Sequence, residues 1–220
     1  MCGRYNLIDN PAVGVLLDNL GIDLDYTPRL NIRPTDSVPI LYQGRSGERR
    51  AADATWWLAM NEDEGRLKPD QRWASFNSRA DNLIDGKIHK ISPRSFRVIL
   101  PATGFHEWAN KVPHNITDAS GGVLALAGVA KYWNHLNAFS CSIVTLPPHD
   151  RFTHIHKKSI PLMLQPGERE IWLDNRVSTE RLTGWFEPRI PFDLSVTPVD
   201  VETLKVLGAA ETIGADRSAN

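Results

Sequence analysis

The sequence predicts an α+β fold with a mainly antiparallel, barrel-like β-sheet core and a few peripheral helices. Short runs rich in β-branched and aromatic residues, bounded by Pro or Gly, outnumber the helical patterns. These runs are not interleaved with helices as in βαβ units, which argues against a doubly wound parallel sheet. With 41% hydrophobic residues and seven Trp, the chain has enough apolar side chains to form a core.

The expected elements follow from capping and turn signals. Asn10 followed by Pro11 predicts the start of a helix over residues 11–20, and Gly21 predicts its end. Two later helices are expected at 168–175 and 179–186, each after a turn or cap signal. Strands are expected at 38–42, 96–100, 123–127, 139–145, 160–164 and 193–199. We expect residues 1–213 to form one domain and residues 214–220 a short flexible tail.

The charges are nearly balanced, with 25 Lys and Arg against 26 Asp and Glu and a net charge of -1. Such a chain has no global field that draws it to nucleic acid or to anionic lipid, so binding of a polyanion requires a local patch. One window holds Lys87, Lys90, Arg94 and Arg97 without an acid. Taken alone, this pattern is typical of a solvated face.

Targeting and redox signals favour a cytoplasmic protein. No stretch approaches the ~18 uncharged apolar residues of a membrane span, and the N-terminus lacks the apolar segment of a secretory signal. Two cysteines cannot form a disulfide framework, which is consistent with a reducing compartment. Cys141 lies in an apolar run, and we expect it to be a small core residue.

Cys2 directly follows the initiator methionine. Removal of Met1 would leave a 1,2-aminothiol, whose α-amine has a pKa near ~8 and is therefore partly nucleophilic at neutral pH. Such an amine condenses with an aldehyde to a Schiff base, and the thiol then closes on the imine carbon to give a thiazolidine. The alternative is an incidental second-position cysteine, because a lone thiol is weak evidence for a nucleophile.

Glu107 lies between His106 and Trp108, after the expected strand at 96–100. A carboxyl group that is partly desolvated at a strand end has a raised pKa, which suits it to proton transfer. The alternative is a surface Glu in a turn.

Three histidines, His149, His154 and His156, precede Lys157 and Lys158. His-x-His on a strand places both imidazoles on one face, which suggests zinc, but no second Cys or partnered carboxylate lies at ligand spacing. A general acid, or a histidine that steers phosphate beside two lysines, fits the same residues. We expect neither a metal nor a cofactor.

Two polar clusters resemble phosphate-binding loops, at residues 30–35 and 76–79. An Asn amide binds phosphate or sugar oxygens, and Arg supplies a forked cation for phosphates. Each cluster is an ordinary turn if taken singly.

In combination and in this order, these motifs resemble the SRAP (SOS response-associated peptidase) family of abasic-site processing proteins. The matching segments are Met-Cys-Gly-Arg at 1–4, Leu-Asn-Ile-Arg-Pro-Thr at 30–35, Phe-Asn-Ser-Arg-Ala-Asp at 76–81, Gly-Phe-His-Glu-Trp at 104–108, Ile-Val-Thr-Leu-Pro at 143–147 and Pro-Leu-Met-Leu at 161–164.

The resemblance implies antiparallel sheets around a positively lined groove for single-stranded DNA. It also implies a covalent link from Cys2 to the ring-opened aldehyde of an abasic site. By position, the catalytic residues are Cys2, Asn77, Glu107 and His156, and the residues near DNA are Arg4, Pro34, Arg79, Thr145 and Lys158.

The chain departs from the family pattern at two places. His156 is one residue further from Pro161 than in the usual His-x-x-x-Pro spacing, so His154 remains an alternative catalytic histidine. The family's tryptophan-rich wedge is also altered, and the sequence leaves open whether Trp56, Trp57 or Trp73 stacks on DNA.

The resemblance implies a DNA-repair enzyme of the SOS response with autopeptidase activity, which removes Met1, and lyase-type activity. The implied partners are single-stranded DNA containing abasic sites and the replication machinery. We expect a monomer without membrane association, located in the cytoplasm and on the bacterial nucleoid after damage.

Two other functions fit parts of the sequence. Glutamine amidotransferases with an N-terminal nucleophile also begin Met-Cys-Gly, but no Asn-Gly oxyanion pair or Gly-rich strand–loop pattern follows here. A non-covalent single-stranded DNA-binding protein would need only stacking and a basic groove.

Overall fold

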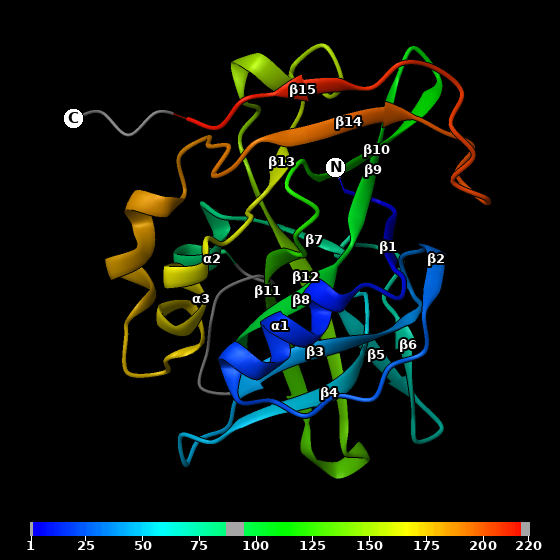
Figure 1. The fold of residues 1–220 in the computed structure, drawn as a ribbon. Helices are drawn as coiled ribbons and strands as arrows, with labels where there is room; N and C mark the ends of the chain where they lie inside the picture. Colours follow the sequence, from blue (N-terminus) through cyan, green and yellow to red (C-terminus); the bar gives the residue numbers. More distant parts are fainter. Residues whose placement is uncertain (1, 87–94, 217–220) are drawn as a thin grey trace.

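The computed structural model describes residues 2–86 and 95–216 (Figure 1). It confirms the predicted fold class, because antiparallel sheets and a closed five-stranded barrel form the molecule and the helices are few. No helix among these residues is both long enough and apolar enough to cross a bilayer.

The barrel is closed because its first and last strands pair with each other. Neighbouring barrel strands are antiparallel except Arg49–Thr55 and Ala138–Leu146, which are parallel. The barrel strand Ser95–Ala102 is buried from Phe96 onward because both of its faces are covered. In order, the strands are β11 (Leu124–Trp133), β8 (Ser95–Ala102), β3 (Ser37–Gln43), β4 (Arg49–Thr55) and β12 (Ala138–Leu146).

A second, fully antiparallel sheet lies above the barrel in the view of Figure 1. Its order is β15 (Glu211–Ile213), β14 (Leu194–Pro198), β10 (Val112–Asp118), β9 (Gly104–Ala109), β1 (Tyr5–Leu7) and β2 (Arg29–Ile32). Only Thr103 separates β8 from β9, so one stretch of chain passes from the barrel into this sheet.

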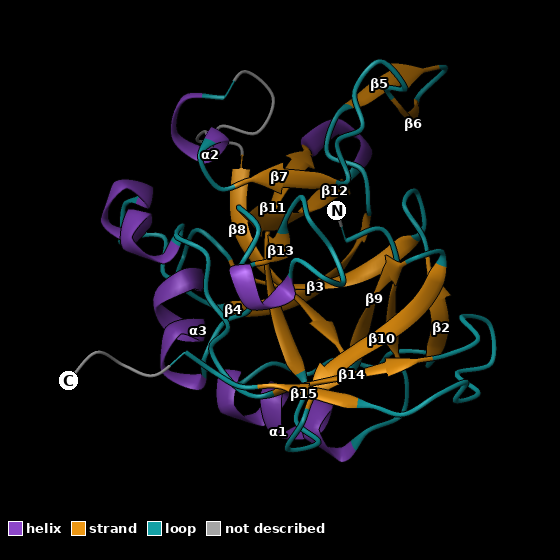
Figure 2. Ribbon diagram, turned by 90° about the horizontal axis from the view of Figure 1, so that it is seen from above, coloured by secondary structure: helices purple, strands orange, loops and turns teal. Residues whose placement is uncertain are grey.

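Four further short strands complete the described part of the fold. β7 (Asn77–Arg79) and β13 (Ile160–Pro161) both pair with β12. β5 (Met60–Asp63) and β6 (Arg66–Pro69) form a hairpin, which projects away from the two larger sheets in Figure 2. The expected strand at 160–164 is therefore shorter than predicted, although Met163 still forms an isolated bridge with Leu126.

Helix α1 (Pro11–Leu20) begins and ends as the sequence predicts. The Asn10 side chain accepts a hydrogen bond from the Ala12 N–H at 2.8 Å, and Gly21 adopts φ 61° at the C-terminal end. Helix α3 (Pro166–Leu173) lies close to its expected position. The segment expected as a helix at 179–186 is a 3-10 helix (Thr179–Trp185), while α2 (Asn82–Asp85) was not expected. Short 3-10 turns also occur at Asn134–Leu136 and Asp150–Phe152.

Arg97 is not part of a solvated face, so that interpretation is wrong for this residue. It is 5% exposed, and its guanidinium donates to the carbonyls of Trp172 and Val177 at 2.6 Å each and to that of Asp174. The cation thus satisfies carbonyls at the C-terminal end of α3 and fixes this helix against β8. The rest of the basic window, 87–94, lies outside the described residues.

The first residues of the expected tail form hydrogen bonds with the rest of the fold. The Ala215 N–H donates to the Asp193 carboxylate at 2.7 Å, and the Asp216 N–H donates to the Ile190 carbonyl at 2.8 Å. Residues 217–220 lie outside the described residues. Cys141 is fully buried in β12, as expected for a core residue.

We predict that Arg97→Ala lowers the free energy of unfolding by about 3 kcal/mol, because buried carbonyls lose a charged donor. Arg176→Ala is the matched control: its side chain is 88% exposed and pairs with Asp174 at the same helix end. We expect the control to lose less than about 1 kcal/mol. Urea denaturation measures both, and equal losses would show that the buried guanidinium does not stabilise α3.

Candidate functional site

The segment that contains Cys2 lies along β9. The His106 N–H donates to the Arg4 carbonyl at 2.9 Å, and Tyr5 pairs with Phe105 in the antiparallel register. This alignment brings Cys2, which is fully buried, close to Glu107. Burial raises the pKa of the Cys2 thiol, and the nearby Glu107 carboxylate raises it further. The sulfur is therefore held as a thiol.

Asn77 approaches Cys2 from the barrel. β7 pairs in parallel with β12, with Asn77 opposite Ile143, and this places Asn77 at the N-terminal end of β7. Its Nδ2 donates to the Cys2 carbonyl at 2.9 Å. A side chain from the barrel thus fixes the backbone of a residue aligned with the second sheet.

Glu107 contacts His156. The Oε2 of Glu107 lies 3.0 Å from the Nδ1 of His156, which follows the 3-10 turn at Asp150–Phe152. Burial raises the pKa of Glu107 to about 7. Burial, together with the charge of Lys158, lowers the pKa of His156 to about 4. Near neutral pH the imidazole is therefore neutral, and Glu107 is the group that changes its charge.

The other two histidines of the cluster lie at different carboxylates. His154 is 52% exposed, and its Nε2 lies 2.6 Å from Glu211, whereas His149 contacts Asp216 at 3.1 Å. Among residues 2–86 and 95–216, no group of three His, Cys, Asp or Glu side chains is placed to hold a metal ion. Of the two alternatives for the catalytic position, His156 is the one that contacts Glu107.

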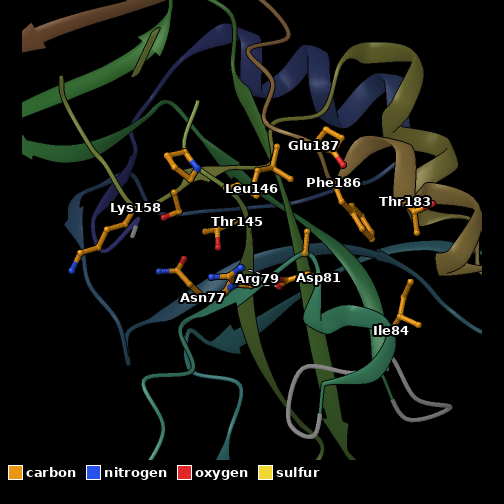
Figure 3. Close-up of a pocket in the computed structure, with 14 residues that line it drawn as sticks. Asn77, Arg79, Asp81, Ile84, Thr145, Leu146, Lys158, Thr183, Phe186 and Glu187 are labelled. Carbon is orange, nitrogen blue, oxygen red and sulfur yellow. Dashed lines mark hydrogen bonds and ion pairs between the residues drawn. The ribbon is translucent and has the colours of Figure 1, made fainter. Parts of the chain in front are cut away.

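A cleft of about 670 Å³ opens beside Asn77. Arg79, Thr145 and Lys158 also line it, and Figure 3 shows these polar side chains facing an apolar end that contains Ile84 and Phe186. Arg79 is exposed, and its guanidinium is paired with Asp81 at 2.6 Å. The cleft combines the cations of Arg79 and Lys158, the carboxylates of Asp81 and Glu187, an amide and apolar surface.

Arg4 and Pro34 lie apart from this cleft, at the edge formed by β1 and β2. Burial lowers the pKa of Arg4, and the charge of Arg33 lowers it further, so the two cations are close to each other. The residues expected near DNA therefore form two groups, with the Cys2 segment between them.

The structure distinguishes among the tryptophans. Trp56 and Trp57 belong to the core, with exposed fractions of 0% and 8%, whereas Trp73 is 51% exposed and Trp108 is 39% exposed. Of the three considered from the sequence, only Trp73 has a ring accessible to a base. Trp108 was not considered, although it directly follows Glu107.

His106 is a buried polar residue beside the site that the sequence reasoning did not single out. It is fully buried, and its Nε2 accepts a hydrogen bond from Asn6 Nδ2 at 2.8 Å. Burial, with the charge of Arg4, lowers the pKa of His106 to about 4. Successive strand residues point to opposite faces of a sheet. A strand that places Glu107 on one face therefore places His106 on the other, and this alternation was the signal available in the sequence.

Comparisons with known proteins identify the family of this chain. A family model described as SOS response associated peptidase (SRAP) matches residues 1–206. The chain belongs to the SRAP family. Two relatives of this SRAP chain are the abasic site processing proteins YoaM and YoqW of Bacillus subtilis, each 26% identical. The matches cover 79% of this chain in both cases, and 79% of YoaM and 80% of YoqW.

Solved structures have the same fold as this SRAP chain. A protein from Bordetella bronchiseptica superposes with a TM-score of 0.70 at 17% identity, over 90% of this chain and 100% of that protein. A phage-related protein from the same organism gives 0.65 at 20% identity, over 93% and 99% of the two chains. A protein from Bacteroides thetaiotaomicron gives 0.64 at 18% identity, over 90% and 92%.

We predict that His106 makes this SRAP chain sensitive to acid. Because the pKa of His106 is lowered to about 4, its contribution to stability is present above pH 6.5 and is lost as the pH falls through 4. The contribution is about 3 kcal/mol. His106→Gln loses a hydrogen bond at pH 7 but lacks this acid-dependent loss.

The measurement is the free energy of unfolding in urea between pH 4 and pH 7. The difference between wild type and His106→Gln should shrink on acidification, while the exposed His135→Gln should remain parallel to wild type. A constant difference between wild type and His106→Gln would contradict the prediction.

Proposed function

We propose that this chain binds single-stranded DNA and, after removal of Met1, forms a thiazolidine crosslink between Cys2 and the ring-opened aldehyde of an abasic site. The observation that carries the proposal is the convergence on Cys2: Asn77 donates to its carbonyl, and the Glu107–His156 pair lies beside it. Family membership and the names of the Bacillus subtilis relatives, which are abasic site processing proteins, support the same reaction.

The crosslink forms with the net loss of one water. The Cys2 amine adds to the aldehyde carbon, and the resulting carbinolamine loses water to give an imine. The thiol then adds to the imine carbon, and its proton ends on the nitrogen. Each step takes a proton from a nucleophile and delivers one to an oxygen or a nitrogen, which requires a base and an acid at the same place.

Glu107 supplies the base. Its pKa of about 7 leaves a useful fraction ionised at neutral pH, yet makes the carboxylate basic enough to accept a proton from the ammonium form of the Cys2 amine or from the thiol as its sulfur adds to the imine carbon. The same carboxylate serves at the same nitrogen in the autocatalytic removal of Met1.

His156 acts on the sugar side of the reaction. Its pKa of about 4 makes it neutral near pH 7, so it does not act as a standing cation. Instead, Nδ1 takes the proton that Glu107 collects, and the other ring nitrogen delivers a proton to the sugar oxygen. This relay opens the closed hemiacetal form of the abasic sugar.

Arg79, Thr145 and Lys158 bind the strand in the cleft, and Arg4 and Pro34 contact it beyond Cys2. Because the net charge is only -1, the affinity depends on these few cations. The exposed rings of Trp73 and Trp108 are available to stack on bases.

We predict that wild-type protein gives a denaturant-resistant adduct with single-stranded DNA that contains an abasic site, and none with an intact strand. Cys2→Ala should abolish the adduct, and Cys2→Ser should leave at most a reversible imine. Denaturing gels measure this. An undiminished adduct from Cys2→Ala would exclude the thiazolidine, and strand binding that high salt abolishes, without an adduct, would favour a non-covalent binder.

We predict that Glu107→Gln and His156→Ala slow crosslinking by ~10²–10⁴-fold without abolishing DNA binding. The wild-type rate should rise with pH through about 7, because the raised pKa of Glu107 leaves the base protonated below that pH. Single-turnover rates between pH 5 and 9 test this, and Glu107→Gln should lack the rise near pH 7.

His154→Ala is the matched control, because this neighbouring histidine contacts Glu211 instead of Glu107. It should crosslink at the wild-type rate. A slow His154→Ala together with a normal His156→Ala would reverse the assignment, and normal rates for both would leave Glu107 as the sole proton-transfer group of the three.

A further inference from the structure

A polar cluster at the β2 edge lies on the opposite side of the Cys2 segment from the cleft. Here Asn31 Nδ2 donates to Glu202 Oε1 at 2.6 Å, and Arg33 Nη2 donates to the same oxygen at 2.7 Å. Arg4 is close enough that the charge of Arg33 lowers its pKa and the charge of Glu202 raises it, after the lowering by burial. The Arg33 guanidinium and the Asn31 amide therefore share one carboxylate oxygen, and Arg4 lies near enough to sense both charges.

Asn31 is held rigidly in this cluster. It is 6% exposed and adopts φ 50°, a conformation that few residues other than Gly and Asn tolerate. Its N–H donates to Asn6 Oδ1 at 2.9 Å, and the amide of Asn6 in turn donates to buried His106. The backbone of Asn31 is thus fixed by the core, independently of Glu202, and it presents the side-chain amide to Glu202.

Glu202, in contrast, lies at the exposed surface. It lies on the exposed turn between β14 and β15, where the Asp200 carboxylate accepts from the N–H of Glu202 at 3.1 Å and from the N–H of Thr203 at 2.9 Å. In Figure 1 this turn passes beside β2. The Glu202 side chain is 60% exposed and that of Arg33 is 52% exposed. Exposed pairs of this kind contribute ~0.2–1 kcal/mol, so the contact is readily broken.

We infer that Asn31, Arg33 and Arg4 form a binding site for a backbone phosphate of single-stranded DNA, and that Glu202 occupies this site in the unbound protein. A phosphate oxygen and a carboxylate oxygen accept from the same Arg and amide donors. Asp36 is the other carboxylate near these cations, and its Oδ2 already accepts from Arg29 at 2.8 Å and from the Arg33 N–H at 2.9 Å. Glu202 is therefore the carboxylate that a phosphate replaces.

The exchange affects both affinity and path. Without Glu202, the cluster would attract any polyanion. With Glu202 in place, the free energy that a DNA strand gains here is only the difference between binding a phosphate and binding the Glu202 carboxylate. The site also gives the strand a second anchor, because Arg79 and Lys158 lie in the cleft on the other side of Cys2. A strand held at both ends must cross Cys2. This inference rests on the proposed function only for the identity of the ligand.

The test compares how tightly Glu202→Gln and Glu211→Gln bind an intact short oligothymidylate. Fluorescence anisotropy measures the binding at several salt concentrations. Both changes remove one exposed acid that forms an ion pair, but Glu211 lies on β15, at the opposite edge of the same sheet from β2. We expect Glu202→Gln to bind about two- to fivefold more tightly, with a salt slope steeper by about one. Glu211→Gln should match wild type.

The double variant Glu202→Gln/Arg33→Ala should bind no more tightly than Arg33→Ala alone, because the gain requires the freed guanidinium. Equal affinities for Glu202→Gln and Glu211→Gln would overturn the inference, as would a gain that persists without Arg33 or a complete lack of binding to the intact strand. The readout is independent of the crosslink. A gain for Glu202→Gln without any abasic adduct would refute the proposed function and leave the phosphate site intact.

Discussion

The reactive centre depends on the alignment of residues 4–6 with β9. The fully buried Tyr5 side chain, the backbone hydrogen bond from His106 to Arg4 and the pairing of Tyr5 with Phe105 determine where the chain start lies. Two site residues approach this N-terminal segment: Asn77 from the barrel and Glu107 from β9. Since β8 continues almost directly into β9, Glu107 is attached to a buried strand of the barrel.

The sequence predicts the apolar part of this architecture well. Helix α1 follows from Asn10 and Gly21, and the barrel strands β3, β8, β11 and β12 follow from continuous apolar runs. Strands such as β10, which contains His114, Asn115 and Asp118, were missed because their polar residues suggest a loop. Their stability comes from pairing with β9 and β14, which local propensity does not describe.

The site itself required tertiary information. Order and residue type indicate Cys2, Asn77, Glu107 and His156, but only the register of β7 on β12 brings Asn77 to the Cys2 carbonyl. Spacing alone could not choose between His154 and His156 as the partner of Glu107. Arg97 was misinterpreted for the same reason, because the carbonyls that bind it belong to residues far along the chain.

Full burial of the Cys2 sulfur also bears on chemical durability. Oxidants and soft metal ions attack the thiolate, and both burial and the adjacent carboxylate keep this sulfur protonated. The sulfur donates a hydrogen bond to the Arg4 carbonyl, which requires the protonated thiol. An oxidant therefore meets little thiolate at this position, and we expect Cys2 to oxidise more slowly than a cysteine exposed at the surface.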